Sequence, residues 1–312
     1  MLFRPPRRLV VIGAGPIGCE LAQAFARFGS QVTLIASGPN ILAKEDADAA
    51  SVVETALRRD GIELLTNARV SRVSRDAGGK QVWIERGGDS CSRVADELLV
   101  AVGRMPNVSD LGLPNAGVEF DSQAGIRVDD HFRTTNRAVF AAGDACSRFQ
   151  FTHAADAMAR IVLQNALFPG RGKGSSLVIP RCTYTDPEVA AVGLTEAEAR
   201  ECGVAVDVLV EEMSDNDRAV LDGETAGFAK LLLKRGTDQI VGATIVASHA
   251  GDMLNELTLA MTTKIGLSTL ARTIHPYPTQ GEVVKRLADQ FSRRRLTPTV
   301  KWLFAKWFAW TR

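Results

Sequence analysis

A glycine-rich turn near the start of the chain limits the fold more than any other feature. Residues 9–12 (LVVI) form a continuous apolar run, typical of a buried parallel strand, and GAGPIG follows at once. Apolar residues then recur at helical spacing up to Phe28, Gly29 stands where a helix ends, and residues 32–35 supply a second apolar run. The pattern predicts a complete βαβ unit and therefore an α/β fold.

The three glycines of this turn are of the type that binds a diphosphate. Gly13, Gly15 and Gly18 permit a tight turn, close approach of the backbone to a pyrophosphate, and tight packing of helix on sheet. The anion would lie at the helix N-terminus, where free N–H groups and the helix dipole favour negative charge. We therefore predict that Gly13, Gly15, Pro16 and Gly18 bind a dinucleotide. The alternative is that the glycines only tighten a turn.

The end of the second strand bears on which nicotinamide nucleotide binds. An NAD-binding fold commonly has an acid here that bonds the adenosine 2′-hydroxyl, whereas this chain has Ala36 followed by Ser37. Nothing at this point repels a 2′-phosphate, which favours NADP, although no arginine stands at the strand end to bind the phosphate. A neutral site that accepts either NADP or NAD is the alternative.

Further elements of the same domain are predicted up to residue 103. They are a helix at 48–60, a strand at 62–65, a β meander over 68–97 with turns at 77–80 and 86–89, and a strand at 98–102. The last strand ends at a second glycine turn, GRMPN at residues 103–107.

The pattern changes twice beyond residue 109. A shorter stretch contains an apolar strand at 138–142, the dipeptide Gly143-Asp144 and a helix at 154–167, and the glycine- and serine-rich residues 170–176 are expected to form a linker. Up to about residue 290 the chain then resembles an α+β domain. Its predicted strands are 204–210, 228–233 and 240–246, and its predicted helices are 196–202 and 253–263.

Composition and charge exclude several classes of protein. Lys and Arg number 37 against 36 Asp and Glu, so the net charge of +1 gives no reason to expect a nucleic-acid partner. The five cysteines are odd in number and widely spaced, and the four histidines lack metal-ligand spacing, which argues against a disulfide framework and a metal site. The N-terminus has neither the apolar region nor the cleavage site of a signal peptide, so we expect a cytoplasmic location.

The last residues form a basic, aromatic tail. Residues 293–312 hold six basic and no acidic side chains, and residues 300–310 contain three of the four tryptophans. A helix would place several apolar side chains roughly on one side, namely Val300, Leu303, Phe304, Trp307 and Trp310. Such helices can lie in a membrane interface, and about 11 residues are fewer than the ~20 needed to cross a membrane. Peripheral membrane contact, packing on a dimer and disorder all stay open.

Five motifs occur in the order found in one enzyme family. GAGPIGCELA (13–22) resembles a nicotinamide loop, AVGRMPN (101–107) a second glycine turn, and VFAAGDA (139–145) a flavin-ribityl motif. TDPEVAAVGLTEAEA (185–199) and HPYPTQGE (275–282) resemble the opening and closing motifs of a dimerisation domain. Over roughly residues 7–290 the chain is therefore similar to the class I pyridine-nucleotide disulfide oxidoreductases, the family of mercuric reductase, dihydrolipoamide dehydrogenase and glutathione reductase.

The resemblance implies an α/β fold in four parts. A Rossmann-type NAD(P)-binding domain would span 7–108, the C-terminal part of an FAD-binding domain 109–174, an α+β dimerisation domain 175–290, and the basic aromatic tail 291–312. The implied protein is a homodimeric FAD- and NAD(P)H-dependent oxidoreductase. In such enzymes hydride passes from the nicotinamide to the flavin and on to an acceptor, while the protein positions both rings.

The resemblance also implies roles near the nicotinamide. Glu20 matches a glutamate that pairs with a lysine near the flavin, and the alternative is a solvated acid in the first helical turn. Val70, Gly103 and Arg104 match positions along the nicotinamide nucleotide. The alternative is that these residues only pack at the ends of strands and contact no nucleotide.

A second set of residues matches the flavin site of the family. Gly143 and Asp144 lie in the ribityl motif, whose acid accepts a hydrogen bond from the ribityl chain. His153 and Ala154 match the start of a helix that faces the flavin ring, and a plain helix cap is the alternative. FAD is the cofactor that this part of the resemblance implies.

The closing motif HPYPTQGE departs from the family in one position. The family usually has a histidine directly before Pro-Thr, oriented by a later glutamate, so that it can relay protons to redox thiols of the partner subunit. Here that position holds Tyr277, Glu282 keeps the orienting position, and His275 lies two residues upstream. A phenol with a reference pKa of about 10 is a poor base at neutral pH. Tyrosine resembles the mercuric-reductase branch, and interface packing is the alternative for Tyr277 and His275.

Two family features do not occur in residues 1–312: a flavin-binding GxGxxG loop ahead of the nicotinamide loop, and the redox CxxxxC pair. The C-terminal cysteine pair of the mercuric branch does not occur either. An incomplete gene product, a deliberate fragment and one half of a split enzyme completed by a separate N-terminal FAD domain are the open interpretations. We expect residues 109–174 then to expose an unpaired strand edge. A non-catalytic dinucleotide-binding and dimerisation remnant is the alternative function.

Overall fold

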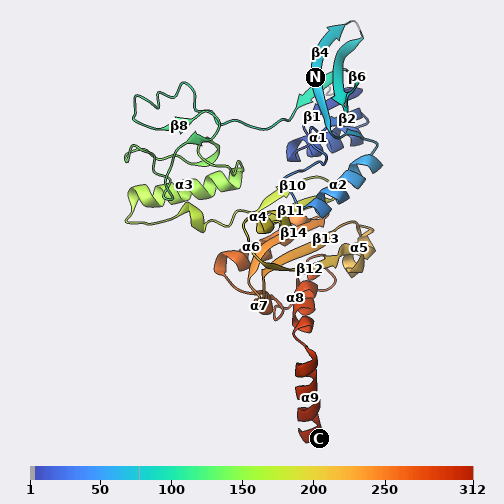
Figure 1. The fold of residues 1–312 in the computed structure, drawn as a ribbon, viewed down its shortest axis with the longest axis vertical. Helices are drawn as coiled ribbons and strands as arrows, with labels where there is room; N and C mark the ends of the chain where they lie inside the picture. The colour runs from blue at the N-terminus through green and yellow to red at the C-terminus, as the bar shows by residue number, and fades with distance from the viewer. Residues whose placement is uncertain (1–3, 77, 312) are drawn as a thin grey trace. The chain divides into compact units, whose positions relative to one another are not determined.

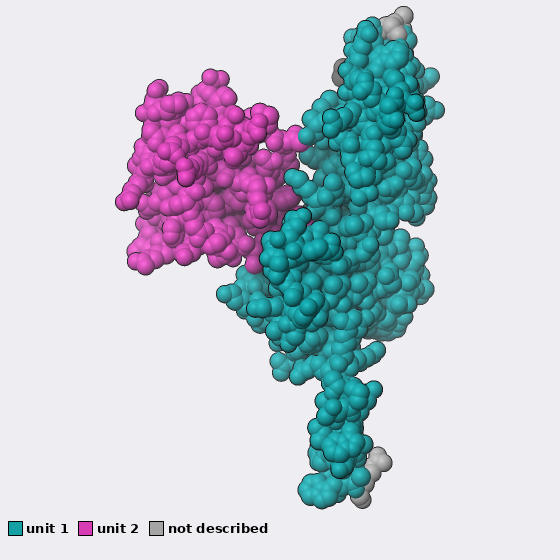
Figure 2. All heavy atoms as spheres, in the orientation of Figure 1, with its two compact units in different colours: residues 1–102, 182–312 teal, residues 103–181 magenta. Residues whose placement is uncertain are grey.

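The computed structural model describes residues 4–76 and 78–311. Residues 1–3 of the N-terminus, Ala77 of the predicted turn and Arg312 of the tail lie outside the described residues. The chain divides into two compact units, residues 1–102 together with 182–312 and residues 103–181 (Figure 2). Among the described residues, the first unit holds three sheets, and the second holds one two-stranded sheet beside a long helix.

The predicted βαβ unit is confirmed. A parallel sheet has the strand order β3-β2-β1-β7. Helix α1 connects β1 to β2 and helix α2 connects β2 to β3, because parallel strands need a crossover, whereas residues 68–95 lie between β3 and β7 (Figure 1). Val11 and Leu34 are fully buried on one face of this sheet, whereas Val10 and Ile35 face the other side. The bounds are β1 (Arg8–Ile12), α1 (Pro16–Arg27), β2 (Gln31–Ile35), α2 (Ala47–Arg59), β3 (Glu63–Leu65) and β7 (Glu97–Val100).

The predicted β meander is also confirmed. Strands β4 (Ala68–Asp76), β5 (Gly79–Arg86) and β6 (Asp89–Ala95) form an antiparallel sheet in that order. Val82 and Ile84 are fully buried and pack in one cluster with Val10 and Ile35 of the parallel sheet. This packing holds the meander against that face of the parallel sheet.

The remainder of the first unit is an α+β layer, as predicted. Its antiparallel sheet has the order β10-β11-β14-β13-β12, and β13 and β14 are buried almost throughout because α6 covers one face and α2 meets the other. The strands are β10 (Arg181–Thr183), β11 (Glu188–Gly193), β12 (Val206–Glu212), β13 (Phe228–Lys234) and β14 (Ile240–Ala247). The helices are α4 (Glu196–Glu201), η3 (Met213–Asp215), α5 (Asp217–Asp222), α6 (Ala250–Thr263), α7 (Leu267–Leu270) and α8 (Glu282–Arg294).

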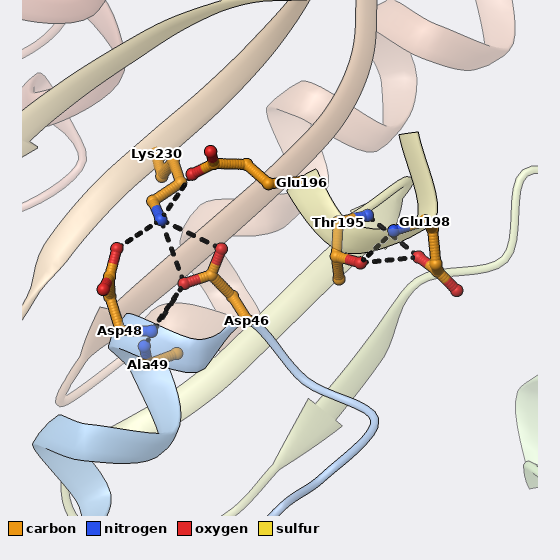
Figure 3. A network of polar contacts seen from close by, with 7 residues as sticks. All are labelled: Asp46, Asp48, Ala49, Thr195, Glu196, Glu198 and Lys230. Atoms are coloured by element: carbon orange, nitrogen blue, oxygen red, sulfur yellow. Dashed lines mark hydrogen bonds and ion pairs between the residues drawn. The ribbon is translucent and has the colours of Figure 1, made fainter. Parts of the chain in front are cut away.

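A buried lysine joins the two halves of the first unit, of which the first half is residues 1–102 and the second half is residues 182–312. The Nζ of Lys230 on β13 lies 3.0 Å from both carboxylate oxygens of Asp46, 2.6 Å from Asp48 and 2.9 Å from Glu196 (Figure 3). Asp46 also caps α2, since its side chain accepts hydrogen bonds from backbone amides of the first helical turn. We call these four residues the Lys230 clamp. Apolar side chains of the second half that pack in the core of the first half are Val189, Phe228 and Val246.

The second unit contains the predicted long helix but not the predicted strand. Helix α3 (Thr152–Leu167) packs over Phe132 with Ala154, Met158 and Ile161 in one buried cluster. The other elements are β8 (Phe120–Asp121), β9 (Gly125–Ile126), η1 (Gly143–Ala145) and η2 (Gly174–Ser176).

The prediction of a strand at 138–142 is wrong. This segment folds back on the chain just before it, where the amide of Val139 donates to the carbonyl of Asn136, and it makes a single bridge between Arg133 and Phe140. A strand needs a ladder of hydrogen bonds to a neighbour, and this short return cannot supply one. Because no strand forms here, the predicted exposed strand edge is not formed either. The Arg133 guanidinium lies over the half-buried ring of Phe140.

The segment 170–176 is not the free linker that its composition predicts. The side chain of Asn165 on α3 exchanges two 2.9 Å hydrogen bonds with the backbone of Gly172. Ser175 donates from its amide and its hydroxyl to the carboxylate of Asp130. These side-chain contacts fix the segment against the second unit, and composition alone does not reveal them.

The tail forms the predicted helix, α9 (Pro298–Thr311), which projects beyond α8 (Figure 1). None of its described side chains is buried. The large apolar residues exposed on it are Trp302, Leu303, Phe304, Trp307, Phe308 and Trp310. Within the described part of the chain, every helix is too short or too polar to cross a membrane.

Candidate functional site

Two of the three loop glycines are required by the fold itself. Gly13 has φ +105°, and its amide donates to the carbonyl of Ile35 at 2.9 Å. A Cβ on Gly13 would lie 2.4 Å from the carbonyl oxygen of Ala101, and one on Gly18 would lie 1.9 Å from that of Gly13. Neither position can accept a side chain, because backbone surrounds both. Gly13 and Gly18 therefore set how closely α1 approaches the sheet.

Gly15 differs from its two neighbours. It is the N-cap of α1, and a Cβ built on it meets no atom within 4 Å. Pro16 occupies the first turn, and no described side chain caps this end of the helix. The start of α1 thus presents unpaired backbone amides to open space, which fits the diphosphate of a dinucleotide. The geometry supports both uses of glycine that the sequence predicts.

The end of β2 lies beside a cavity that the sequence does not reveal. The amide of Ala36 donates to the carbonyl of Leu65 at 2.8 Å, and Ala36 is buried, whereas Ser37 is exposed. The cavity has a volume of about 350 Å³. Its lining residues come from the strand end, from the start of β4 and from the β5–β6 turn: Ser37, Asn67, Arg69, Glu85, Arg86, Gly87, Gly88 and Ser90. Two arginines near the strand end were therefore missed by sequence analysis.

Glu20 and Val70 occupy different environments. Glu20 lies on α1, and its carboxylate accepts a 2.8 Å hydrogen bond from the backbone amide of Tyr184. Val70 is half-buried on β4, next to a bulge, and packs against the cluster that contains Val10 and Ile35. Both residues belong to the first unit.

The second unit brings the second glycine turn and the ribityl motif together. Arg104 Nη1 lies 3.1 Å from a carboxylate oxygen of Asp144, and both side chains are about half exposed. They line a cavity of about 470 Å³ with residues that flank both motifs: Met105, Pro106, Asn107, Ala145 and Gln150. Gly103, with φ +115°, starts this turn. The predicted residues Arg104 and Asp144 are thus neighbours although 40 positions separate them in the sequence.

Gly143 and the start of α3 lie close to one another in the same unit. A Cβ on Gly143 would lie 2.9 Å from the Cβ of Ala155, and the φ of +74° also favours glycine. Ala154 is buried, and His153 Nε2 lies 2.8 Å from the carbonyl oxygen of Pro180. The N-terminus of α3 carries no side-chain cap among the described residues. It could therefore meet a polar ligand.

Each of the three predicted residues of the closing motif contacts a charged side chain. Tyr277 is 68% exposed and donates its hydroxyl to Asp217 at 2.7 Å, and this contact raises the pKa of the phenol. Its phenol therefore stays protonated near neutral pH. His275 lies 3.0 Å from Glu256, and its side chain is 10% exposed. Glu282 begins α8 and lies 3.9 Å from Arg286. Asp217 and Glu256, which sequence analysis did not single out, are the acids that hold Tyr277 and His275.

The cysteines are separate from one another in the structure. All five are free thiols. Burial raises the pKa of Cys19 and of Cys182 to about 12 and that of Cys146 to about 11, so these thiols stay protonated near neutral pH. In the part of the chain that the structure describes, no three His, Cys, Asp or Glu side chains gather as metal ligands do.

Comparison with known proteins places these features in one family. The model of the pyridine nucleotide-disulphide oxidoreductases matches residues 3–159, and that of their dimerisation domain matches residues 179–288. A mercuric reductase of Bacillus cereus is 37% identical over 94% of this chain and 46% of its own length. A dihydrolipoyl dehydrogenase of Thermus scotoductus is 35% identical over 93% of this chain and 63% of its own.

Solved structures give the same result. The HOCl-induced flavoprotein disulfide reductase RclA of Escherichia coli superposes with a TM-score of 0.83 at 30% identity, over 92% of this chain and 66% of RclA. LpdA of Mycobacterium tuberculosis superposes with a TM-score of 0.86 at 29% identity, over 93% of this chain and 62% of LpdA. The chain thus spans about half to two thirds of the length of its relatives. It belongs to the pyridine nucleotide-disulphide oxidoreductase family.

Proposed function

We propose that this chain provides three parts of an FAD- and NAD(P)H-dependent oxidoreductase of the disulfide-reductase type. These are an NAD(P)-binding domain at 7–108, the C-terminal part of an FAD-binding domain at 109–174, and a dimerisation domain at 175–290, followed by the tail 291–312. When bound, the nicotinamide and flavin carry hydride to an acceptor. The observation that supports this most directly is the uncapped N-terminus of α1, where Gly15 faces open space.

The residues of the chain act by binding and orienting. The amides at the start of α1 hold the diphosphate, and Glu20 lies one helical turn further along. Val70 and Gly103 border the nicotinamide nucleotide. We assign no residue of the chain to a covalent step, because the cofactors supply that chemistry.

The flavin would be held by the second unit. Asp144 is 46% exposed beside Arg104, so its carboxylate keeps oxygens free to accept hydrogen bonds from ribityl hydroxyls. Gly143 lets α3 approach closely, and the uncapped start of that helix at His153 and Ala154 faces the ring. A separately encoded FAD domain is the partner that would complete this half.

The dimerisation domain supports a homodimer. The family model that matches residues 179–288 is that of a dimerisation domain. Ile274 is 94% exposed and Leu259 is 60% exposed, so both side chains are free to contact a second chain. Tyr277 lies in the same part of the domain, where the family places a residue that serves the partner subunit's site. Tyr277, His275 and Glu282 are the residues that we propose to act there.

A substitution at Gly15 tests the nucleotide site. Gly15→Ala has room for its methyl group, so the melting temperature should stay close to that of the wild type, while the methyl group blocks the approach of the diphosphate. We expect affinity for NADPH and NADH, measured by titration calorimetry, to fall by about tenfold or more, which corresponds to about 1.4 kcal/mol. Gly281→Ala is the control, because Gly281 is also an open N-cap glycine. Unchanged affinity in Gly15→Ala would contradict the assignment.

A non-catalytic dinucleotide-binding and dimerisation protein is the second candidate. It is favoured by the state of the thiols: all five cysteines are free, and burial keeps Cys19, Cys146 and Cys182 protonated near neutral pH. Mixing the chain with a separately expressed flavin domain distinguishes the two candidates. NAD(P)H oxidation that appears only in the mixture supports the split enzyme, whereas binding without oxidation supports the second candidate.

We further propose a cytoplasmic protein whose tail contacts an anionic membrane surface. Helix α9 exposes six large apolar side chains, and Lys301 and Lys306 stand on the same helix, which has no acidic residue. Co-sedimentation with phosphatidylglycerol vesicles should exceed that with phosphatidylcholine vesicles. Lys301→Gln should weaken it about fivefold, since one basic side chain contributes about 1 kcal/mol at such a surface. Equal, weak sedimentation with both lipids would instead favour packing of α9 on the dimer.

A further inference from the structure

The cavity beside Ser37 lies where the adenosine end of a nicotinamide nucleotide is expected. In dinucleotide-binding folds the residue at the end of the second strand contacts the ribose 2′ position, and an arginine nearby accommodates a 2′-phosphate. Here β2 ends at Ile35, and the next residues, Ala36 and Ser37, lead to the cavity of about 350 Å³. The strand end itself supplies only a hydroxyl.

The backbone fixes the start of β4 to this strand end. The amide of Asn67 donates to the carbonyl of Gly38 at 2.8 Å, and the amide of Ala68 donates to that of Ala36 at 3.0 Å. The next residue, Arg69, is therefore held a short distance from Ser37, and both line the cavity. The position of Arg69 is thus a consequence of backbone hydrogen bonds and not of a mobile loop.

Strand pairing brings a second arginine to the same place. In the antiparallel register of β4 and β5, Ala68 pairs with Arg86, and Arg69 pairs with Glu85. Arg86 ends β5 and also lines the cavity, with Gly87 and Gly88 leading to β6. Two arginines and one glutamate are therefore among the residues that line the cavity.

These two arginines are available for an anion. Arg69 and Arg86 are exposed, and no described residue forms an ion pair or a side-chain hydrogen bond with either. Arg93 in the same sheet differs, because Glu63 holds it at a short distance. A guanidinium presents planar N–H donors that match a phosphate, and Ser37 and Ser90 add hydroxyl donors.

We propose that Arg69 and Arg86 bind the adenosine 2′-phosphate of NADPH and give the chain a preference for NADPH over NADH. This inference rests on the proposed nicotinamide-nucleotide site at α1. The arginines come from the meander and not from the residues that directly follow β2. Glu85 opposes them, so it limits the preference.

Equilibrium binding to the full chain tests the proposal. Titration calorimetry gives the dissociation constants of NADPH and NADH for the wild type and for Arg69→Gln, Arg86→Gln and the double variant. Each single substitution should weaken NADPH binding by about tenfold, which corresponds to about 1.4 kcal/mol, and leave NADH binding within about twofold. Adenosine 2′,5′-bisphosphate should compete with NADPH in the wild type and lose this ability in the double variant.

Two controls make the result specific. Arg75 lies further along β4 and does not line the cavity, so Arg75→Gln should leave both affinities unchanged. Glu85→Gln should have the opposite sign and tighten NADPH binding, because it removes the only carboxylate among the lining residues. The preference for NADPH should also shrink as ionic strength rises, since salt screens exposed charges.

The outcomes separate this inference from the proposed function. If the wild type binds neither nucleotide, the proposed function is wrong. If the wild type binds both and the double variant, with an unchanged melting temperature, keeps the same ratio of affinities, the nucleotide site stands and the role of the arginines is refuted. Equal losses for NADPH and NADH would also refute the role, because the 2′-phosphate is their only difference.

Discussion

Replacement of Lys230 by methionine should destabilise the first unit more than any other single loss of charge in it. Lys230 is 5% exposed, and its closest buried partner, Asp46, is 4% exposed. Methionine has a similar length and no charge, so the Asp46 carboxylate would stay buried without its cation. Removal of one partner from a buried ion pair costs about 3–5 kcal/mol.

The structure places the expected cost at the lower end of this range. Asp46 keeps two backbone hydrogen bonds at the start of α2, 3.0 Å from the amide of Asp48 and 3.4 Å from that of Ala49, and these still satisfy one oxygen. The side chain of Asp48 is 72% exposed and that of Glu196 is 39% exposed, so water screens both, and each contributes about 1 kcal/mol or less. We therefore expect a loss of about 3 kcal/mol for Lys230→Met.

Urea denaturation followed by circular dichroism measures this loss as a lower midpoint. Lys234→Met is the matched control, because Lys234 lies at the exposed end of the same strand, and it should change stability by less than about 0.5 kcal/mol. Asp46→Asn added to Lys230→Met should recover part of the loss, since an asparagine still caps α2 but leaves no buried charge. If Lys230→Met and Lys234→Met unfold at the same urea concentration, the reasoning is refuted.

The pH dependence gives an independent check on the clamp. Burial alone would lower the pKa of Lys230, but the hydrogen bonds that its ammonium donates to three carboxylates outweigh that effect and raise the pKa. A raised lysine pKa stabilises the folded state fully below the unfolded value of about 10.4 and loses this effect as pH rises through the folded pKa. The stability difference between wild type and Lys230→Met should therefore stay constant over neutral pH and shrink only in strong alkali.

Three further predictions concern single residues. Gly18→Ala should lower the melting temperature of the chain in a thermal scan, unlike Gly15→Ala, because its Cβ would overlap a carbonyl of the same loop. Asp217→Asn should lower the pKa of Tyr277, measured by ultraviolet titration in a Tyr184→Phe background that leaves one tyrosine; an unchanged pKa would show that the 2.7 Å contact is not formed. Iodoacetamide near pH 8, with modified sites identified by mass spectrometry, should label the exposed cysteines much faster than the buried ones; the exposed pair is Cys91 and Cys202.

Local patterns predicted the elements of the first unit because each one buries an apolar face in a regular way. The run at residues 9–12 is buried on both sides of its sheet. The apolar runs that predicted β13 and β14 are likewise buried on both sides, because these strands lie between two layers of helices. Helix α2 has an added start signal, since Asp46 accepts bonds from the first-turn amides. In these segments local preference and tertiary packing agree.

The two failed predictions lie in the second unit, where tertiary contacts decide the local structure. Residues 138–142 have the composition of a strand, but they bond to the chain just before them over a single bridge. Residues 170–176 have the composition of a linker, but Asn165 and Asp130 hold them by side-chain hydrogen bonds. For residues 170–176 the outcome depends on Asp130, which lies 45 positions before Ser175 and outside any local window of sequence. For residues 138–142 it depends on a short return of the chain onto Arg133 and Asn136, which the apolar run itself does not indicate.

The proposed preference for NADPH depends on distant residues in the same way. A sequence rule examines the residues that directly follow β2, and by that rule Ala36 and Ser37 leave a 2′-phosphate without a cation. The cavity at that strand end is shared with residues more than 30 positions later, since β4 starts beside Gly38 and β5 returns antiparallel to it. The charge near a ligand depends on every residue that lies close to it in space. Arginines of a neighbouring sheet can therefore take the place of an arginine that directly follows β2. Arg69 and Arg86 can therefore supply the charge that the strand end lacks.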